Sequence, residues 1–322
     1  MKKTGLLLVL CLAGAGFAQQ AESAGPAETD AGQNVISTHV SFPFERVQTP
    51  TYADLYCSGF MSKQAVPPAN YVAGDLETPN TTKTENGDIV YLAGSGYKAG
   101  QEYEIVRELH DPNRYELFPG QHAVVQATGQ AYSEVGRVRV VDTRSRMAIA
   151  QVVFACDPVN PGDFAMPFVE KQPVSFHPPV RFDRFAPANG KVSGRIVMSK
   201  DFDYELGTGA KLYMNVGSNQ GVKVGDYFRA VRSYRADLKD PVDSLSFKAA
   251  YAEDTQKRPP SFDANMFTKT SGPNIRVEDL PRRALAEIVV VGTTPTTATG
   301  MIVFAVEDVR AGDTVELDEQ QQ

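Results

Sequence analysis

The segment VGRVRVVDTRSRMAIAQVVFACDPVNPGD, residues 135–163, decides the fold, because the chain repeats it as LAEIVVVGTTPTTATGMIVFAVEDVRAGD at residues 285–313. The two segments align without a gap at an offset of 150 residues. Identical positions near their ends are Val153, Phe154, Ala155, Val159, Gly162 and Asp163, each matched by its partner. A repeat of this kind predicts duplicated structural units.

Shorter blocks further upstream repeat in the same order, with small insertions in the second copy. Residues 97–107 align with 222–232, residues 90–96 with 212–221, and residues 57–63 with 192–200. Chance similarity between β-rich segments would not preserve this order. We therefore expect a mainly β protein with two tandem duplicated small β-barrel or sandwich domains and a short helical insertion in the second.

The local patterns favour strands joined by tight turns. RVRVVD and EIVVVG are rich in β-branched residues, and the following runs AIAQVVFA and TGMIVFAV are almost continuously apolar. Such runs suit strands buried on both faces, and a buried helix is the alternative that periodicity alone leaves open. Gly-Asp pairs begin at Gly74, Gly87, Gly162, Gly225 and Gly312. We interpret each pair as a tight turn that precedes a strand, rather than as a phosphate or metal site.

The ends and the Pro-rich stretches predict the domain boundaries. We expect a signal peptide at 1–18, a disordered leader at 19–40, a first β-domain at 41–170, a Pro/Phe-rich linker at 171–190, a second β-domain at 191–318 with an insertion at 233–282, and a tail at 319–322. Signal cleavage could follow Ala15 or Ala18.

The charged and apolar start of the chain predicts export from a bacterium, to the periplasm or the extracellular medium. No later segment is apolar enough to suggest a transmembrane span. Removal of Lys2 and Lys3 with the signal peptide changes the formal net charge from −7 to −9. Such an acidic chain is a poor candidate for binding nucleic acid.

Two cysteines, Cys57 and Cys156, remain after signal cleavage, and an oxidising compartment favours their pairing. In the repeat alignment they match Val192 and Val306. We therefore predict a disulfide in the first domain and a buried Val192–Val306 contact in the second. Two separate buried thiols are the alternative.

The second copy has about 50 residues where the first has about 27, and residues 240–257 have a helical pattern of apolar positions. The aromatic residues of this insertion are a candidate partner surface: Tyr234, Phe247, Tyr251, Phe262 and Phe267. They could equally pack against their own barrel.

No catalytic, cofactor or metal motif is apparent in the sequence. The four histidines lack zinc-like spacing, and no nucleophile elbow, P-loop or dinucleotide-binding motif occurs. The stretch DFDYELG at 201–207 has alternating carboxylates but lacks the glycine and glutamate positions of a calcium loop.

The block NVGSNQGVKVGDYFRAVR at 215–232, followed by residues 284–317, resembles the C-terminal domain of flagellar assembly protein T and the small β-barrels that follow LysM modules in bacterial envelope proteins. The shared feature is a G-x-x-x-G-V-x-x-G-D hairpin before a strand, from Gly217 to Asp226. The resemblance covers about 90 residues of the second copy and implies an envelope scaffold or binding role without catalysis. We therefore expect a non-enzymatic exported protein whose partner is an envelope protein or the cell wall; peptidoglycan or glycan binding is the alternative, and an enzyme with an unrecognised site is a third.

Overall fold

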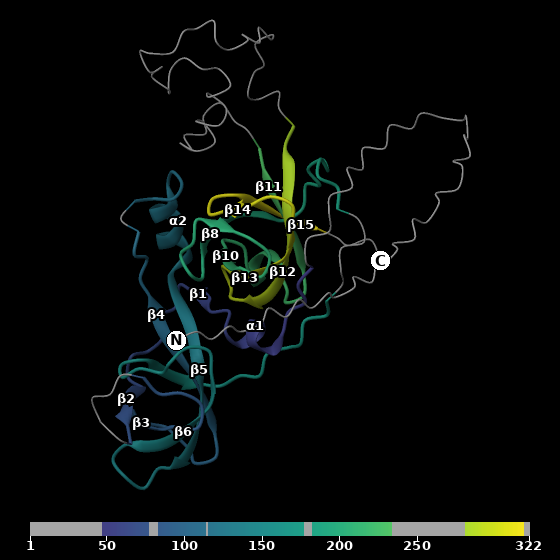
Figure 1. Cartoon of the computed structure of the whole chain (residues 1–322). Coiled ribbons are helices and arrows are strands. Elements are labelled where there is room, and N and C mark those ends of the chain that lie inside the picture. Colours follow the sequence, from purple (N-terminus) through teal and green to yellow (C-terminus); the bar gives the residue numbers. More distant parts are fainter. Residues whose placement is uncertain (1–46, 77–82, 114, 177–181, 234–280, 319–322) are drawn as a thin grey trace, which may run out of the picture. The chain divides into compact units, whose positions relative to one another are not determined.

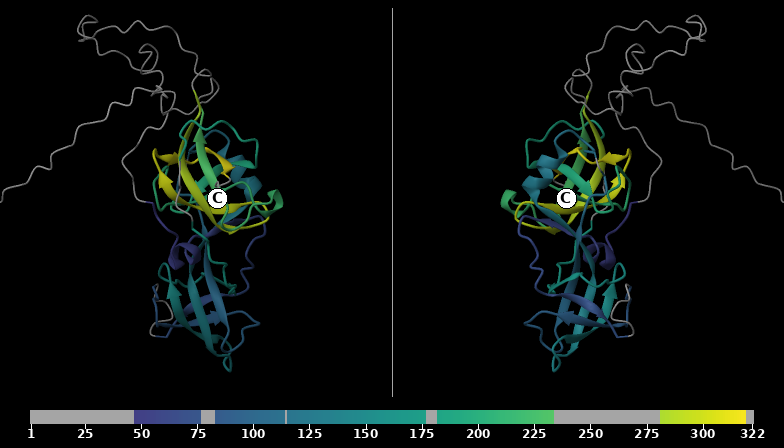
Figure 2. Two further views of the ribbon diagram at one scale, coloured as in Figure 1. Left: turned by 90° about the vertical axis from the view of Figure 1, so that its right-hand side faces the viewer. Right: turned by 90° about the vertical axis from the view of Figure 1, so that its left-hand side faces the viewer.

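The computed structural model describes residues 47–76, 83–113, 115–176, 182–233 and 281–318, all within one compact unit spanning residues 41–322. The predicted signal peptide, leader and tail, and the predicted helix and partner surface of the insertion, lie outside the described residues. Figures 1 and 2 draw the strands of the first barrel in blue to teal and those of the second in green to yellow.

The first barrel closes through six strands, β5-β4-β7-β2-β3-β6, with β6 returning to β5. The strands are β2 (Tyr71–Asp75), β3 (Ile89–Ala93), β4 (Glu102–Leu109), β5 (Gln130–Asp142), β6 (Ala148–Ala155) and β7 (Phe164–Pro167). A seventh strand, β1 (Phe60–Ser62), pairs with the start of β5 outside this ring.

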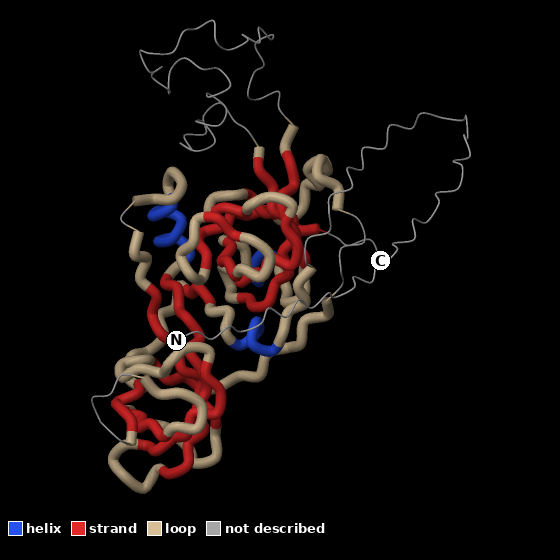
Figure 3. The backbone as a smooth tube through the Cα atoms, in the orientation of Figure 1, coloured by secondary structure: helices blue, strands red, loops and turns tan. Residues whose placement is uncertain are grey.

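The second barrel also closes through six strands, β12-β11-β15-β8-β10-β13. They are β8 (Ser193–Ser199), β10 (Lys211–Met214), β11 (Tyr227–Arg232), β12 (Arg283–Thr293), β13 (Ala298–Ala305) and β15 (Thr314–Asp318), and short strands β9 (Glu205–Leu206) and β14 (Val309–Arg310) pair beside them. Strands and loops dominate the described chain, as Figure 3 shows. The mainly β prediction is confirmed.

The two barrels match strand for strand, which confirms the internal repeat. Tyr103 of β4 pairs with Val138, and its counterpart Phe228 of β11 pairs with Ile288, 150 residues beyond Val138. The Cys156 amide donates to the Val135 carbonyl at 2.8 Å, and the Val306 amide donates to the Leu285 carbonyl at the same distance. Cys156 and Val306 are therefore equivalent positions.

The alignment of residues 57–63 with 192–200 is wrong. Tyr71 of β2 pairs with Phe164, and Arg195 of β8 pairs with Thr314, so β8 is the counterpart of β2 and not of the segment around Cys57. Val192 instead precedes β8, where its carbonyl accepts from Leu317. Because β1 and its flanking residues are an addition to the first copy, Cys57 has no counterpart at Val192. The predicted buried Val192–Val306 contact therefore loses its basis, and both valines are only partly buried.

Each barrel has an apolar interior of its own. In the first, Val72, Leu92, Ile105, Val138 and Val152 belong to one buried cluster. In the second, the corresponding cluster is larger and includes Leu212, Met214, Phe228, Leu285 and Ile302. Burial of these side chains, at about 25 cal/mol per Å² of apolar surface, stabilises both barrels.

Four of the five Gly-Asp pairs form the predicted turns. Gly87, Gly162, Gly225 and Gly312 all have φ between 92° and 98°, in the left-handed region that favours glycine. In each turn the aspartate accepts a hydrogen bond from the amide three residues before it, at 2.7–2.8 Å. Gly74 is the exception, since it lies inside β2 at a register shift.

The last of these aspartates in each copy also holds an arginine of the neighbouring strand. Arg107 binds Asp163 through two bonds of 2.7 Å, and Arg232 binds Asp313 through bonds of 2.9 and 2.7 Å. Both arginines also donate to a loop carbonyl, that of Pro158 or Asp308. The shared Val-Arg and Gly-Asp motifs of the repeat thus form one duplicated bidentate ion pair.

The described α-helices belong to the first copy, not to the insertion. Helix α1 (Tyr52–Tyr56) begins with a capping box between Thr51 and Asp54. Helix α2 (Gln121–Thr128) lies in the β4–β5 connection, where Glu116 accepts from the amides of Gly120 and His122 at its start. Within the described residues, neither helix has the length and apolar character needed to span a membrane.

Candidate functional site

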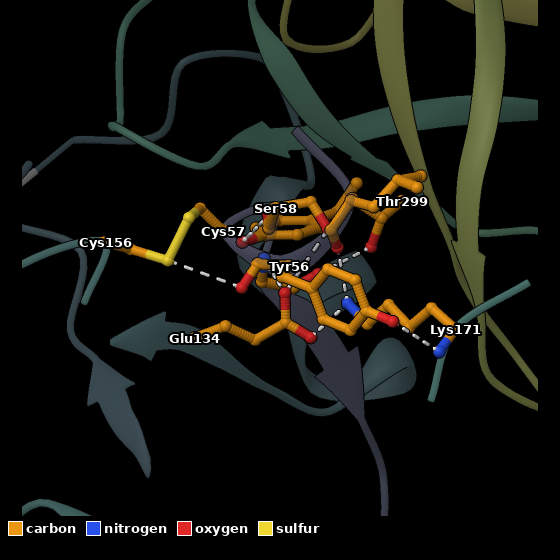
Figure 4. A network of polar contacts seen from close by, with 10 residues as sticks. Tyr56, Cys57, Ser58, Glu134, Cys156, Lys171 and Thr299 are labelled. Atoms are coloured by element: carbon orange, nitrogen blue, oxygen red, sulfur yellow. Dashed lines mark hydrogen bonds and ion pairs between the residues drawn. A yellow bond between two sulfur atoms is a disulfide. The ribbon is translucent and has the colours of Figure 1, made fainter. Parts of the chain in front are cut away.

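A short segment that follows α1 and includes β1, which we call the junction segment (residues 57–62), contacts both barrels. Its connection to the first barrel is covalent, because Cys57 forms a disulfide with Cys156, at a Cα–Cα distance of 5.6 Å. This pairing confirms the predicted disulfide. Figure 4 shows the polar network that surrounds it.

Three side chains of the second barrel donate to backbone carbonyls of the junction segment. The Tyr213 hydroxyl donates to Ser58 at 3.2 Å, Thr299 Oγ1 to Gly59 at 2.9 Å, and Thr297 Oγ1 to Met61 at 2.7 Å. Both threonines and the tyrosine are buried. Because unpaired buried carbonyls are costly, these bonds fix the segment in place.

Glu134 of β5, in the first barrel, binds the same segment through hydrogen bonds. Its Oε2 accepts from the Gly59 amide at 3.0 Å and from Ser58 Oγ at 3.4 Å. Its Oε1 forms an ion pair with Lys171, whose Nζ also donates to the Leu55 carbonyl at 2.6 Å. Glu134 is 3% exposed, so its charge is stabilised by these partners rather than by water.

Gly59 is required at the centre of this network. Its φ is +70°, and a Cβ there would collide with the Tyr213 hydroxyl and the Tyr132 carbonyl. Glycine therefore allows Glu134 and the second barrel to approach the same residue from two sides.

A second ion pair joins α1 to the second barrel. Asp54 Oδ1 lies 2.5 Å from Lys211 Nζ of β10. Burial alone would raise the pKa of Asp54, but the hydrogen bonds from Lys211 and Thr51 outweigh it, so that the pKa is lowered. Helix α2 adds a further link, because Gln121 Nε2 donates to the Val197 carbonyl of β8 at 3.1 Å.

A cavity of about 320 Å³ opens beside Glu134. Its charged lining residues are Glu104, Glu134 and Lys171. Gln172, Thr293 and Thr294 add uncharged polar groups, and the rest of the lining is largely apolar. Burial, and then the charge of Glu134, raise the pKa of Glu104 to about 8, while Lys171 and Arg137 act in the opposite direction. At neutral pH Glu104 therefore keeps its proton for most of the time, and the protonated carboxyl hydrogen-bonds to Glu134.

Sequence reasoning missed Glu134, Glu104 and Lys171. The repeat contained a signal for Glu134, since the position 150 residues later holds Ala284. A glutamate at a buried strand position where the other copy has alanine indicates that this side chain has a role found in the first copy alone.

The base of the long connection (residues 233–282) is fixed by ion pairs. Arg232 at the end of β11 and Arg283 at the start of β12 are opposite each other in the antiparallel strand pair. Arg283 binds Glu307 at 2.7 Å, and Arg282 binds Glu316 through bonds of 2.6 and 2.8 Å. The two ends of the connection are therefore adjacent, and ion pairs anchor the end at β12.

The predicted partner residues of the insertion, Tyr234, Phe247, Tyr251, Phe262 and Phe267, lie outside the described residues, so their grouping stays a prediction. Among the residues that the structure does describe, no three His, Cys, Asp or Glu side chains gather as a metal site would require.

Comparison of the chain with protein-family models and with curated proteins found no match.

Proposed function

We propose that this chain is an exported, non-enzymatic scaffold or binding protein of the bacterial cell envelope, and that the long connection carries its partner surface. The observation that supports this proposal is the paired base of the connection. Residues 232 and 283 pair directly, although 50 residues separate them. A long insertion on a rigid support is a common arrangement for binding loops.

Several contacts strengthen that support. The Ala284 amide donates to the Arg184 carbonyl at 2.7 Å, and the Arg184 guanidinium forms an ion pair with Glu307. Arg282 Nε donates to the Ala186 carbonyl at 2.9 Å. The segment before β8 therefore contacts the start of β12 and adds to the support at the base of the connection.

The compartment is supported by the disulfide, because such bonds persist in oxidising environments. It is also supported by the signal-like start of the sequence and by the resemblance to envelope barrels. The partner we propose is an envelope protein; a cell-wall glycan is the alternative that the test distinguishes.

The test removes the connection without disturbing its base. Replacing residues 234–280 with Asn-Gly leaves a five-residue loop between the paired residues Arg232 and Arg283, a length typical of hairpins. We expect the variant to fold with unchanged thermal stability and to lose the envelope proteins that crosslinking and purification recover with the full chain.

A second variant would replace the five aromatic residues of the predicted partner surface with serine. The matched control is Tyr115→Ser, because Tyr115 is 84% exposed and lies outside the connection. Loss of the partners in the five-serine variant, with the partners retained in Tyr115→Ser, supports the proposal. Recovery of the same partners with the shortened chain would refute it, and co-sedimentation of the full chain with purified peptidoglycan would favour the glycan alternative.

A further inference from the structure

We propose that the cavity beside Glu104 is a binding site for a small organic monocation, a primary ammonium with a short apolar tail. This inference is independent of the proposed function, because it concerns the junction of the barrels and not the long connection.

The cavity has the size and lining of a small-ligand site. Its volume of about 320 Å³ falls at the lower end of the range for such pockets. A water molecule takes about 30 Å³ in the liquid, so there is room for a ligand of several heavy atoms. Its apolar lining comes from Phe60, Met166, Val224 and Val291, and its charged residues Glu104, Glu134 and Lys171 interact with one another.

With Glu104 ionised, the charged residues of the cavity would carry one negative charge that no residue of the cavity wall neutralises. Glu134 and Lys171 neutralise each other through their ion pair. Glu104, 9% exposed, shares the wall with them and is neutral only while it keeps its proton. A bound cation would let Glu104 ionise, and the site would remain neutral overall.

The other surfaces of the cavity cannot supply that charge. Arg137 is the further cation that acts on Glu104, but its guanidinium lies over the Phe168 ring at 4.5 Å and forms an ion pair with Glu102. The walls from β12 and from the turn before β11 contain Val224, Val291, Gly292, Thr293 and Thr294, which have no ionisable side chain.

An organic cation fits the site better than a divalent metal. Both oxygens of Glu134 already accept hydrogen bonds, from the Gly59 amide and from Lys171. Glu104 therefore offers the one carboxylate with capacity for a ligand in this wall, whereas calcium takes six to eight oxygens. An ammonium group needs a single carboxylate, and its alkyl tail would cover the apolar wall.

Binding would release a proton. The ammonium enters as a cation, Glu104 transfers its proton to solvent, and the carboxylate pairs with the ammonium. With a pKa of about 8, only about a tenth of Glu104 is ionised at pH 7, so the affinity should rise about tenfold from pH 6 to pH 7 and more slowly above pH 8.

The experiment uses the full chain and n-butylammonium as the probe. Nuclear magnetic resonance titrations at pH 6, 7 and 8 would follow the amide signals of Gln172, Val224 and Gly292, which line the cavity. We expect saturable shifts at these residues, a dissociation constant that falls about tenfold between pH 6 and pH 7, and no saturation with 1-butanol, which has the tail without the charge.

Two variants complete the test. Glu104→Gln should fold normally, because the glutamine resembles the protonated glutamate, and it should weaken binding at pH 8 at least tenfold and remove its pH dependence. Glu108→Gln, on the same strand but outside the cavity wall, should bind like the wild type. Absence of saturable shifts in the wild type, equal binding of 1-butanol, or unchanged pH dependence in Glu104→Gln would each overturn the proposal.

Discussion

The duplicated arginine–aspartate pair offers an internally controlled measurement of what burial contributes to an ion pair. Arg107–Asp163 and Arg232–Asp313 have the same bidentate geometry and the same additional carbonyl contact. They differ mainly in exposure, since the Arg107 side chain is 33% exposed and that of Arg232 is 8% exposed. Substitution of each arginine by methionine keeps an aliphatic stem and removes the charge.

The cost should be larger in the second barrel. Removal of one partner from a buried pair leaves an uncompensated charge and costs about 3–5 kcal/mol. Arg232→Met should reach this range because water is excluded from Asp313. Arg107→Met should cost about half as much, since solvent can reach Asp163 through the space that the partly exposed arginine occupied.

Native-state hydrogen exchange is the suitable assay because it reports each barrel separately. Amides of β11 and β15 should exchange about two to three and a half orders of magnitude faster in Arg232→Met, at about 1.4 kcal/mol per tenfold. Amides of β4 and β7 should accelerate by one to two orders in Arg107→Met. Equal effects, or a larger effect in the first barrel, would refute the argument that burial sets the difference.

Three further outcomes are expected. Replacing Cys57 and Cys156 with serine should lower the free energy of unfolding by about 2–4 kcal/mol, because the bond closes a loop of 99 residues; an unchanged urea midpoint would contradict this. Glu104 keeps its proton to about pH 8 when folded, whereas an unperturbed glutamate loses it near 4.5, so the folded protein should lose stability as the pH rises between these values and level off above them. Glu104→Gln should flatten that part of the curve in urea titrations, and an identical slope in the wild type and the variant would disprove the assignment. Gly59→Ala should destabilise the junction by more than 2 kcal/mol, because a positive φ and a collision with Tyr132 act together; calorimetry showing a wild-type melting temperature would be incompatible with this reading.

Much of the architecture followed from local patterns. The 150-residue offset, the β-branched runs and most of the Gly-Asp turns predicted strands and turns that the structure confirms, because alternation, apolar runs and positive-φ positions are properties of neighbouring residues. The pairing of Cys57 with Cys156 also followed, although the argument that aligned Cys57 with Val192 was wrong.

The candidate site could not be predicted in the same way. Glu104, Glu134 and Lys171 come from two strands and the segment after β7, and no spacing between them marks a common site. Their meeting depends on how β4 pairs with β5 and on the position of the junction segment, both of which are long-range contacts.

The sequence by itself determined that this chain contains two copies of one β-domain, where most of its turns lie and that its cysteines pair. Only the tertiary structure decided that β8 is the counterpart of β2 and that the segment around Cys57 is an addition. It also decided that a buried acid of the first barrel and hydroxyl groups of the second barrel bind this segment. The physical reason is range: turns and strand patterns arise from residues close in sequence, whereas burial and charge pairing depend on which distant strands come together.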